Sequence, residues 1–192
     1  MIITSIRYSK NVLYDIFVDG EFLCTLEDID IARLKLVEGV EAESDELLTL
    51  ACLGAARRDG LKLLLYKKYA SGDLRAKLVA KGHGGVEAEA AVEHFKVLGY
   101  IDDADYAKRY AADAVRLRHE GAFRIRMALK EKGVPDDDID RVLAGYAKEI
   151  GENLKKLISK GGSDVDKLRR KLVYKGYEFE DINKWIKDKE NG

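Results

Sequence analysis

A nine-residue phrase recurs three times in this chain of 192 residues and constrains its fold more than any other feature. Each copy has an aliphatic residue followed by Arg, then a Leu four positions after the first residue, a Lys three further on and a closing Gly. The copies are Leu74–Gly82, Ile125–Gly133 and Leu168–Gly176, and they start 51 and 43 residues apart. A phrase repeated at such intervals predicts one supersecondary unit used three times.

Each phrase has the pattern of a short helix. Its two aliphatic residues are one helical turn apart, so they share a face and can be buried together. The closing Gly suits a helix end, where a left-handed residue is commonly required. The Arg and the Lys project away from the apolar face. In a single copy they are most simply solvated residues, but three copies with the same basic positions also fit a binding surface.

The segments around each phrase read as further helices, so each unit is predicted to be a helix, the phrase helix and another helix. Such a unit has a thin core, and stacking units end to end stabilises them through neighbour contacts. We therefore expect a mainly α protein, with three tandem three-helix repeats in an elongated curved array. The predicted repeats are residues 44–99, 100–147 and 148–192.

The first 43 residues differ from the rest. Three runs rich in β-branched and aromatic residues read as strands, and Asp19-Gly20 between two of them is a strong hairpin signal. We expect a small N-terminal antiparallel β meander of two or three strands, followed by a short helix. Because so small a sheet is not stable alone, it should lean on the helices.

Charge is distributed unevenly along the chain. The formal net charge is −1, yet residues 1–50 carry four basic and eleven acidic side chains. Basic residues gather instead around the phrases: six against one acidic residue in 62–81, eight against three in 108–132, and eight against two in 155–175. Basic stripes on helices favour an anionic partner, either nucleic acid or an acidic protein surface, although a mixed-charge surface explains them equally well.

Composition and motifs exclude several classes of protein. The sequence has no apolar run long enough to cross a bilayer and no signal-peptide pattern at its N-terminus, and its two cysteines, Cys24 and Cys52, show no metal or redox spacing. We expect a cytoplasmic protein without membrane contact.

Recognisable catalytic chemistry is also lacking. There is no glycine-rich phosphate loop, nucleophile elbow or metal-ligand cluster, so we predict no enzyme activity, cofactor or metal. Three groups of residues have a structural interpretation. The histidines His83, His94 and His119 are expected at the surface or at helix ends. The aspartates Asp102, Asp103 and Asp105 are expected to cap the start of a helix. The tyrosines Tyr100, Tyr106 and Tyr110 are expected in the core.

Two segments closely resemble the central signature of the RecX regulatory proteins. Gly99–Ala107 has the Gly-Tyr-aliphatic-Asp-Asp helix start, and Gly121–Val134 has the Gly and the Ile-Arg-x-x-Leu-x-x-Lys-Gly helix. The phrases at 74–82 and 168–176 resemble the first and third repeats of that family, and the meander resembles an N-terminal segment of its longer members. The chain departs from the strongly basic members because it is nearly neutral.

The resemblance implies three tandem three-helix repeats that bind the RecA recombinase filament on single-stranded DNA. It implies a protein without cofactors that mostly inhibits the ATPase, strand-exchange and coprotease activities of RecA, and so regulates DNA repair, homologous recombination and the SOS response. We expect a monomer with at most weak direct contact to DNA. Two alternatives stay open: a repeat protein that binds DNA or RNA without RecA, and an adaptor for an unrelated protein.

The basic positions of the repeats are the candidate docking residues. The central unit has the densest signature and a local excess of five positive charges over 108–132. We expect its cations to contribute most to docking, with the basic positions of the flanking phrases next. The central candidates are Arg109, Arg116, Arg124, Arg126 and Lys130, and the flanking ones are Arg75, Lys81, Arg169 and Lys175.

Overall fold

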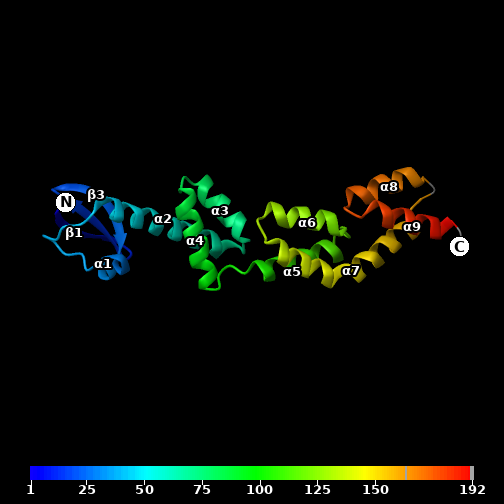
Figure 1. The fold of residues 1–192 in the computed structure, drawn as a ribbon, viewed down its shortest axis with the longest axis horizontal. Coiled ribbons are helices and arrows are strands. Elements are labelled where there is room, and N and C mark those ends of the chain that lie inside the picture. Colours follow the sequence, from blue (N-terminus) through cyan, green and yellow to red (C-terminus); the bar gives the residue numbers. More distant parts are fainter. Residues whose placement is uncertain (163, 191–192) are drawn as a thin grey trace. The chain divides into compact units, whose positions relative to one another are not determined.

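The computed structural model describes residues 1–162 and 164–190, which form two compact units. The first unit comprises residues 1–67 and 74–100, and the second comprises residues 68–73 and the described residues from 101 on. Ser163, Asn191 and Gly192 of the predicted third repeat lie outside the described residues. The prediction of a mainly α fold with a small N-terminal β element is confirmed (Figure 1).

The N-terminal sheet is an antiparallel meander in the order β1-β2-β3. Its strands are β1 (Ile3–Lys10), β2 (Leu13–Val18) and β3 (Glu21–Glu27). Asp19 and Gly20 join β2 to β3, and their φ angles of 50° and 89° are both positive. A two-residue turn with positive φ matches the twist of the flanking strands, so the predicted Asp19-Gly20 hairpin is confirmed.

This sheet packs on a helix, as its small size requires. Ile3, Ile16 and Leu26 are buried in one cluster with Leu47, which belongs to α2 (Ser44–Tyr66). The short helix α1 (Asp28–Leu34) follows β3 directly. Because the sheet shares its core with α2, the meander and the helix form a single folded body.

The rest of the first unit is helical. Helix α3 (Ser71–Ala80) carries the first phrase, and α4 (Gly85–Val97) follows it. Leu74 and Leu78 are fully buried, as the phrase predicts. The residues leading into α3 and its first three residues, 68–73, pack with the second unit, whereas the remainder of the helix belongs to the first.

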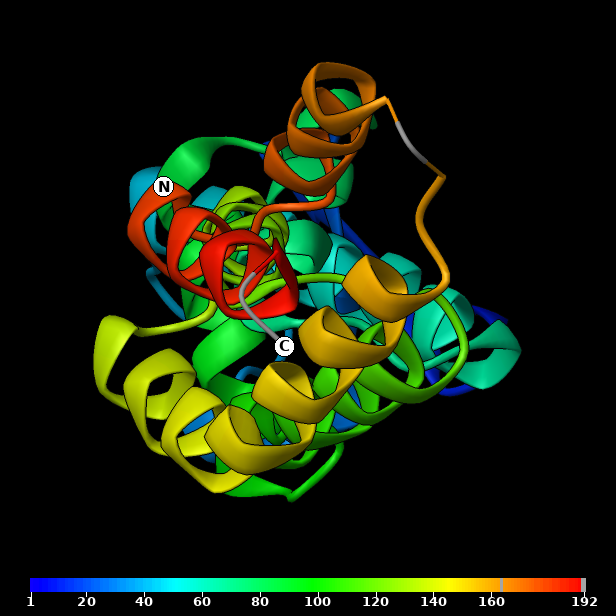
Figure 2. The same cartoon turned by 90° about the vertical axis from the view of Figure 1, so that its right-hand side faces the viewer.

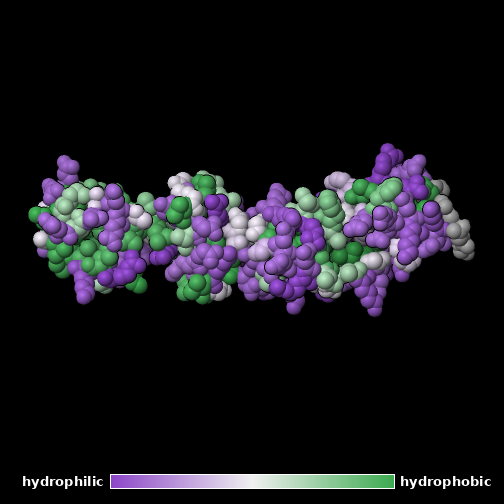
Figure 3. Space-filling model, viewed as in Figure 1, coloured by the Kyte–Doolittle hydropathy of each residue, from purple (hydrophilic) through white to green (hydrophobic). Residues whose placement is uncertain are grey.

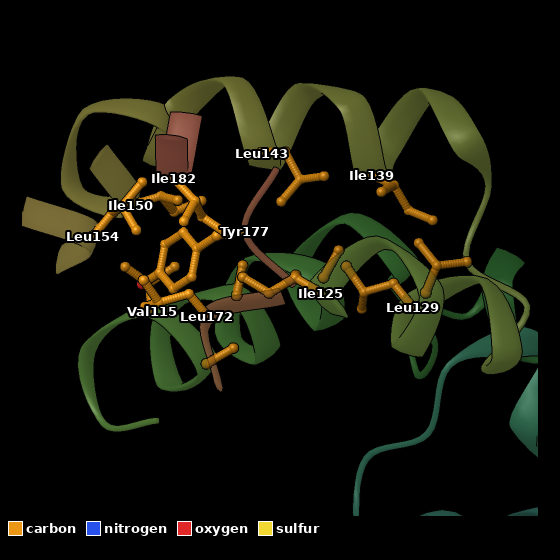
Figure 4. Packing of buried hydrophobic residues seen from close by; sticks show 14 of the residues in the cluster. Val115, Ile125, Leu129, Ile139, Leu143, Ile150, Leu154, Leu172, Tyr177 and Ile182 are labelled. Carbon is orange, nitrogen blue, oxygen red and sulfur yellow. The ribbon is translucent and has the colours of Figure 1, made fainter. Parts of the chain in front are cut away.

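The second unit has one continuous core (Figure 4). Its helices are α5 (Asp103–Arg116), α6 (Ala122–Glu131), α7 (Asp136–Ser159), α8 (Val165–Tyr174) and α9 (Phe179–Glu190). Ile139 and Leu143 of α7 point toward Ile125 and Leu129 of α6. Helices α5 and α6 pack against α7, while α9 contacts both α7 and α8 (Figure 2). Leu129 and Leu172 are fully buried, which confirms the phase predicted for the second and third phrases.

Two details differ from the sequence-based expectation. Helix α7 runs unbroken across the predicted boundary at residues 147 and 148, so the second and third repeats share one helix. Tyr100 was expected in the core but is 55% exposed, because it follows the left-handed Gly99 and precedes α5. Tyr106 and Tyr110, which lie within α5, do pack against the core.

Candidate partner-binding site

In the first two copies, the repeated Arg joins the phrase helix to the next helix of its own repeat. The guanidinium of Arg75 lies 2.7 Å from Glu89, and that of Arg126 lies 2.6 Å from Asp140. In both copies the acidic partner is fourteen residues after the Arg. The third copy has Asn183 at that distance from Arg169, whose guanidinium instead lies 3.5 Å from Asp166. The Arg therefore has an intramolecular role in every copy.

The repeated Lys reaches an earlier part of the chain. Lys132 lies 3.1 Å from the carboxylate of Asp73, and Lys175 donates a 2.6 Å hydrogen bond to the main-chain oxygen of Arg118. Burial lowers the pKa of Lys132, but the hydrogen bond to Asp73 and the electrostatic attraction of Tyr106, Asp73 and Tyr110 together outweigh it, so the net direction is upward. Lys81, in the first copy, is 3.9 Å from Asp59.

The closing glycines let two stretches of backbone meet. A Cβ on Gly133 would lie 2.6 Å from the Cα of Gly72, and one on Gly121 would overlap the carbonyl of Gly176. Main-chain hydrogen bonds cross the second contact, since Gly121 N donates to Lys175 O at 2.8 Å and Phe123 N donates to Gly176 O at 3.1 Å. We call the contact of residues 118–124 with residues 174–177 the α6–α8 joint.

The five central candidates all have acidic partners within the second unit. Arg109 pairs with Asp105 at 3.0 Å, Arg116 with Glu149 at 3.4 Å, Arg124 with Glu120 at 3.1 Å, Arg126 with Asp140 at 2.6 Å and Lys130 with Asp136 at 2.9 Å. The hydrogen bonds that Arg109 and Lys68 donate hold the pKa of the Asp105 carboxyl below its usual value. The local excess of positive charge read from residues 108–132 is thus partly balanced by acids of α7.

These candidates do not form one continuous patch. Arg116 lines a groove of about 660 Å³ between α5 and α7, together with Lys108, Arg141 and Glu149. Arg126 and Lys130 instead face the first turns of α7, through their acidic partners. Arg124 and Lys175 are part of the α6–α8 joint.

The other singled-out residues have structural contacts. Asp102 caps α5 by accepting a 2.9 Å hydrogen bond from the main-chain N–H of Asp105, as predicted. Asp103 is buried and accepts a bond from the N–H of Ser71. His83 lies 3.2 Å from Asp59, and His119 accepts the hydroxyl of Tyr177 on its main-chain oxygen.

Sequence reasoning missed three exposed apolar side chains near these cations. Phe123 and Met127 lie on α6, and Tyr174 ends α8. The spacing of the apolar residues around the second phrase could have revealed that two of them are exposed. Phe123 and Met127 are one turn apart, two positions before the buried Ile125 and Leu129, so they lie on the opposite face.

Comparisons of the sequence and of the fold with known proteins both find RecX proteins. Residues 102–143, which run from the Asp102 cap into α7, match the second three-helix domain of RecX. A regulatory protein RecX of Caldanaerobacter subterraneus is 28% identical and aligns over 96% of this chain and 98% of its own length. The chain is similar to RecX proteins along almost its whole length. A RecX protein of Thermus thermophilus is 40% identical over 83 residues, which are 43% of this chain and 56% of that one.

Solved RecX structures share the fold. One crystal structure of a RecX regulatory protein superposes with a TM-score of 0.75 at 23% identity, covering 97% of this chain and 98% of the other. RecX from Lactobacillus salivarius gives a TM-score of 0.61 at 20% identity, covering 71% of this chain and 96% of its own. In the part of the chain that the structure describes, no helix is long and apolar enough to cross a membrane, and no cluster of His, Cys, Asp and Glu could hold a metal ion.

Proposed function

We propose that this chain binds the RecA filament on single-stranded DNA and modulates it, chiefly by inhibiting its ATPase, strand-exchange and coprotease activities. The similarity to RecX proteins carries this proposal, because those relatives are named regulatory proteins. We also propose that it acts by binding and not by catalysis. His83 and His119, which could serve an enzyme as acids or bases, are engaged in contacts within the fold.

The docking residues that we propose remain the cations of the central unit, which lie at more than one place on its surface. The side chains of Arg109 and Arg116 are 63% and 61% exposed, and that of Lys130 is 45% exposed. Exposed ion pairs of this kind contribute only about 0–1 kcal/mol each. Their cations can therefore exchange an intramolecular carboxylate for an acidic group of the filament at small cost, which makes paired cations compatible with docking.

Co-sedimentation with RecA filaments on single-stranded DNA tests this proposal. The wild-type chain should pellet with the filament, and Arg126→Gln with Lys130→Gln should weaken pelleting because two docking cations are lost. Neutral Gln is preferable to Glu, since Glu would face Asp140 and Asp136 and would strain the fold.

A matched control uses the partner acids. Asp136→Asn with Asp140→Asn frees the same two cations, so this variant should pellet at least as well as wild type. If the Arg126→Gln, Lys130→Gln variant pellets like wild type, these two cations do not dock on the filament, and Lys167, Arg170 and Lys171 of the third repeat become the next candidates. A wild-type chain that never pellets with filaments would favour an adaptor for another protein.

A further inference from the structure

Helices α5 and α7 pack against each other and leave a groove of about 660 Å³ between them, which we call the α5–α7 groove. Asp138, Val142, Gly145 and Glu149 of α7 line it at intervals of three or four residues, so the groove follows one side of that helix. Its volume lies within the range of about 300–1,000 Å³ that is usual for binding sites. The groove is therefore large enough to hold part of a partner.

The floor of the groove is apolar, and at one place it has no side chain. Figure 3 shows hydrophilic side chains over most of the visible face of the second unit, with apolar surface between them. In the groove, Val142 and Tyr146 are partly buried and pack against the core. Between them in sequence, a Cβ added to Gly145 would meet no atom within 4 Å. Glycine permits the close approach of a ligand to the main chain, so this floor can receive an apolar side chain.

The three acidic side chains that line the groove already have cations of the same chain beside them. These ion pairs have N–O distances between 2.8 and 3.4 Å, and they join Asp105 to Lys68 and Arg109, Asp138 to Arg141, and Glu149 to Arg116. The carboxylates are thus neutralised within the fold. An incoming group meets the cations that remain.

Lys108 is the cation of the groove that has no acidic partner. Its side chain is exposed, and among the residues that the structure describes it makes neither an ion pair nor a hydrogen bond. With Lys68 and Arg109 included, five cations face three carboxylates in and beside the groove, an excess of two positive charges. An ammonium group at the edge of an apolar floor is a suitable partner for a carboxylate.

We propose that the α5–α7 groove binds one amphipathic helix of the partner protein, with an acidic side chain beside the apolar face of that helix. The apolar face lies over Gly145, between Val142 and Tyr146, and the carboxylate meets Lys108. A helix placed there packs on two helices at once, as α9 packs on α7 and α8. This inference rests on the filament binding proposed above, and it specifies the kind of segment that RecA presents to this chain.

The charges of the groove favour a protein segment over a nucleic acid. A phosphate backbone carries closely spaced negative charges, which would lie against Asp105, Asp138 and Glu149 as well as against the cations. A helix can place a single carboxylate at Lys108 and apolar side chains elsewhere. The apolar floor then contributes to binding, as it does in other helix-in-groove complexes.

Filling the floor of the groove tests the proposal. Gly145→Leu puts an apolar side chain where the incoming one lies, so it should weaken co-sedimentation with RecA filaments on single-stranded DNA at least about fivefold. Gly145→Ala is the matched control, since it adds only a methyl group in open space, and it should pellet like wild type. Both variants should melt no lower than wild type, because Gly145 is exposed and each change raises helix propensity. A weaker Gly145→Leu chain is then a blocked one and not an unfolded one.

The cation of the groove is tested separately. Lys108→Gln should weaken pelleting between about twofold and fivefold, because one exposed ion pair with the filament is lost. Lys148→Gln makes the same change at an exposed lysine of α7 that does not line the groove, and it should pellet like wild type.

Three results would overturn the proposal while leaving filament binding in place. One is a Gly145→Leu chain that pellets like wild type. Another is a Gly145→Leu chain that loses binding to free single-stranded DNA, without RecA, as strongly as it loses pelleting, which would assign the groove to nucleic acid. The third is a wild-type chain that sediments alone as a dimer and becomes a monomer in Gly145→Leu, which would assign the groove to a second copy. A wild-type chain that never pellets would instead overturn the proposed function, and this inference with it.

Discussion

Single residues of the repeated phrase have distinct physical roles in this fold. Its aliphatic positions fill the core, its Arg contacts an acidic residue, its Lys reaches an earlier part of the chain, and its Gly permits close backbone contact. These roles do not contribute equally. Burial of a Leu in a close-packed core outweighs an exposed ion pair by several-fold, so the aliphatic positions dominate the stability of each unit.

Leu129→Ala should lower the free energy of unfolding by about 2–5 kcal/mol. Leu129 is fully buried between α6 and α7, so its truncation leaves a cavity in a thin core. Urea denaturation followed by circular dichroism measures the change. The control is Met127→Ala on the opposite, half-exposed face of α6, which should change the free energy by no more than about 0.5 kcal/mol. Equal losses in the two variants would mean that the helix phase is wrong.

Tyr177 makes the second unit sensitive to alkaline pH. Burial raises the pKa of its phenol from 10.0 to about 12, and its hydroxyl donates a 3.1 Å hydrogen bond to the main-chain oxygen of His119. Because the folded-state pKa is above the unfolded one, the stabilisation is complete below pH 10 and is lost as the pH rises toward 12. Wild type should therefore lose stability between pH 10 and pH 12 more steeply than Tyr177→Phe, as measured by denaturation at each pH. Parallel pH profiles would contradict this assignment.

At the scale of elements, α6 and α8, which carry the second and third phrases, contact each other through their main chains. In the α6–α8 joint, main-chain N–H groups at the start of α6 donate hydrogen bonds to main-chain carbonyls at the end of α8. This satisfies helix-end groups that would otherwise need water or side-chain caps. It also aligns a positive helix end with a negative one, which is favourable for both dipoles.

Gly121→Ala should destabilise the second unit because its Cβ would overlap the carbonyl of Gly176. We expect a loss of more than about 1 kcal/mol, since both sides of the contact are backbone and cannot rotate away. Gly145→Ala is the matched control in α7, where an added Cβ meets nothing within 4 Å. That variant should gain about 0.4–1 kcal/mol through helix propensity. A Gly121→Ala chain as stable as wild type in thermal melts would show that the joint can open without cost.

Local signals in the sequence predicted most of the elements, because they depend on neighbouring residues. Asp19-Gly20 specified the hairpin, and Gly133 ended α6 with a φ of 72°. The continuity of α7 was not predicted, because the chain was divided into repeats between residues 147 and 148, within this helix. The contact of the candidate Lys175 could not be predicted from the sequence, since Lys175 and Arg118 are 57 residues apart and only the fold brings them together.

At the scale of the whole molecule, charge is divided between acidic and basic parts of the chain. The acidic N-terminal segment folds into the sheet of the first unit, whereas the second unit holds the central and third phrases with their cations. We expect the second unit to supply most of the filament contact, because electrostatic complementarity governs how fast and how selectively partners associate. Raising the salt concentration should therefore weaken filament binding.

ATP hydrolysis by RecA on single-stranded DNA, followed while the wild-type chain is titrated in, tests the central claim most directly. The account predicts that the hydrolysis rate falls and then saturates as the chain occupies the filament, and that the Arg126→Gln, Lys130→Gln chain requires a higher concentration for the same fall. A rise in rate would overturn inhibition while leaving modulation in place. A rate that stays constant while the chain pellets with the filament would contradict the regulatory role itself.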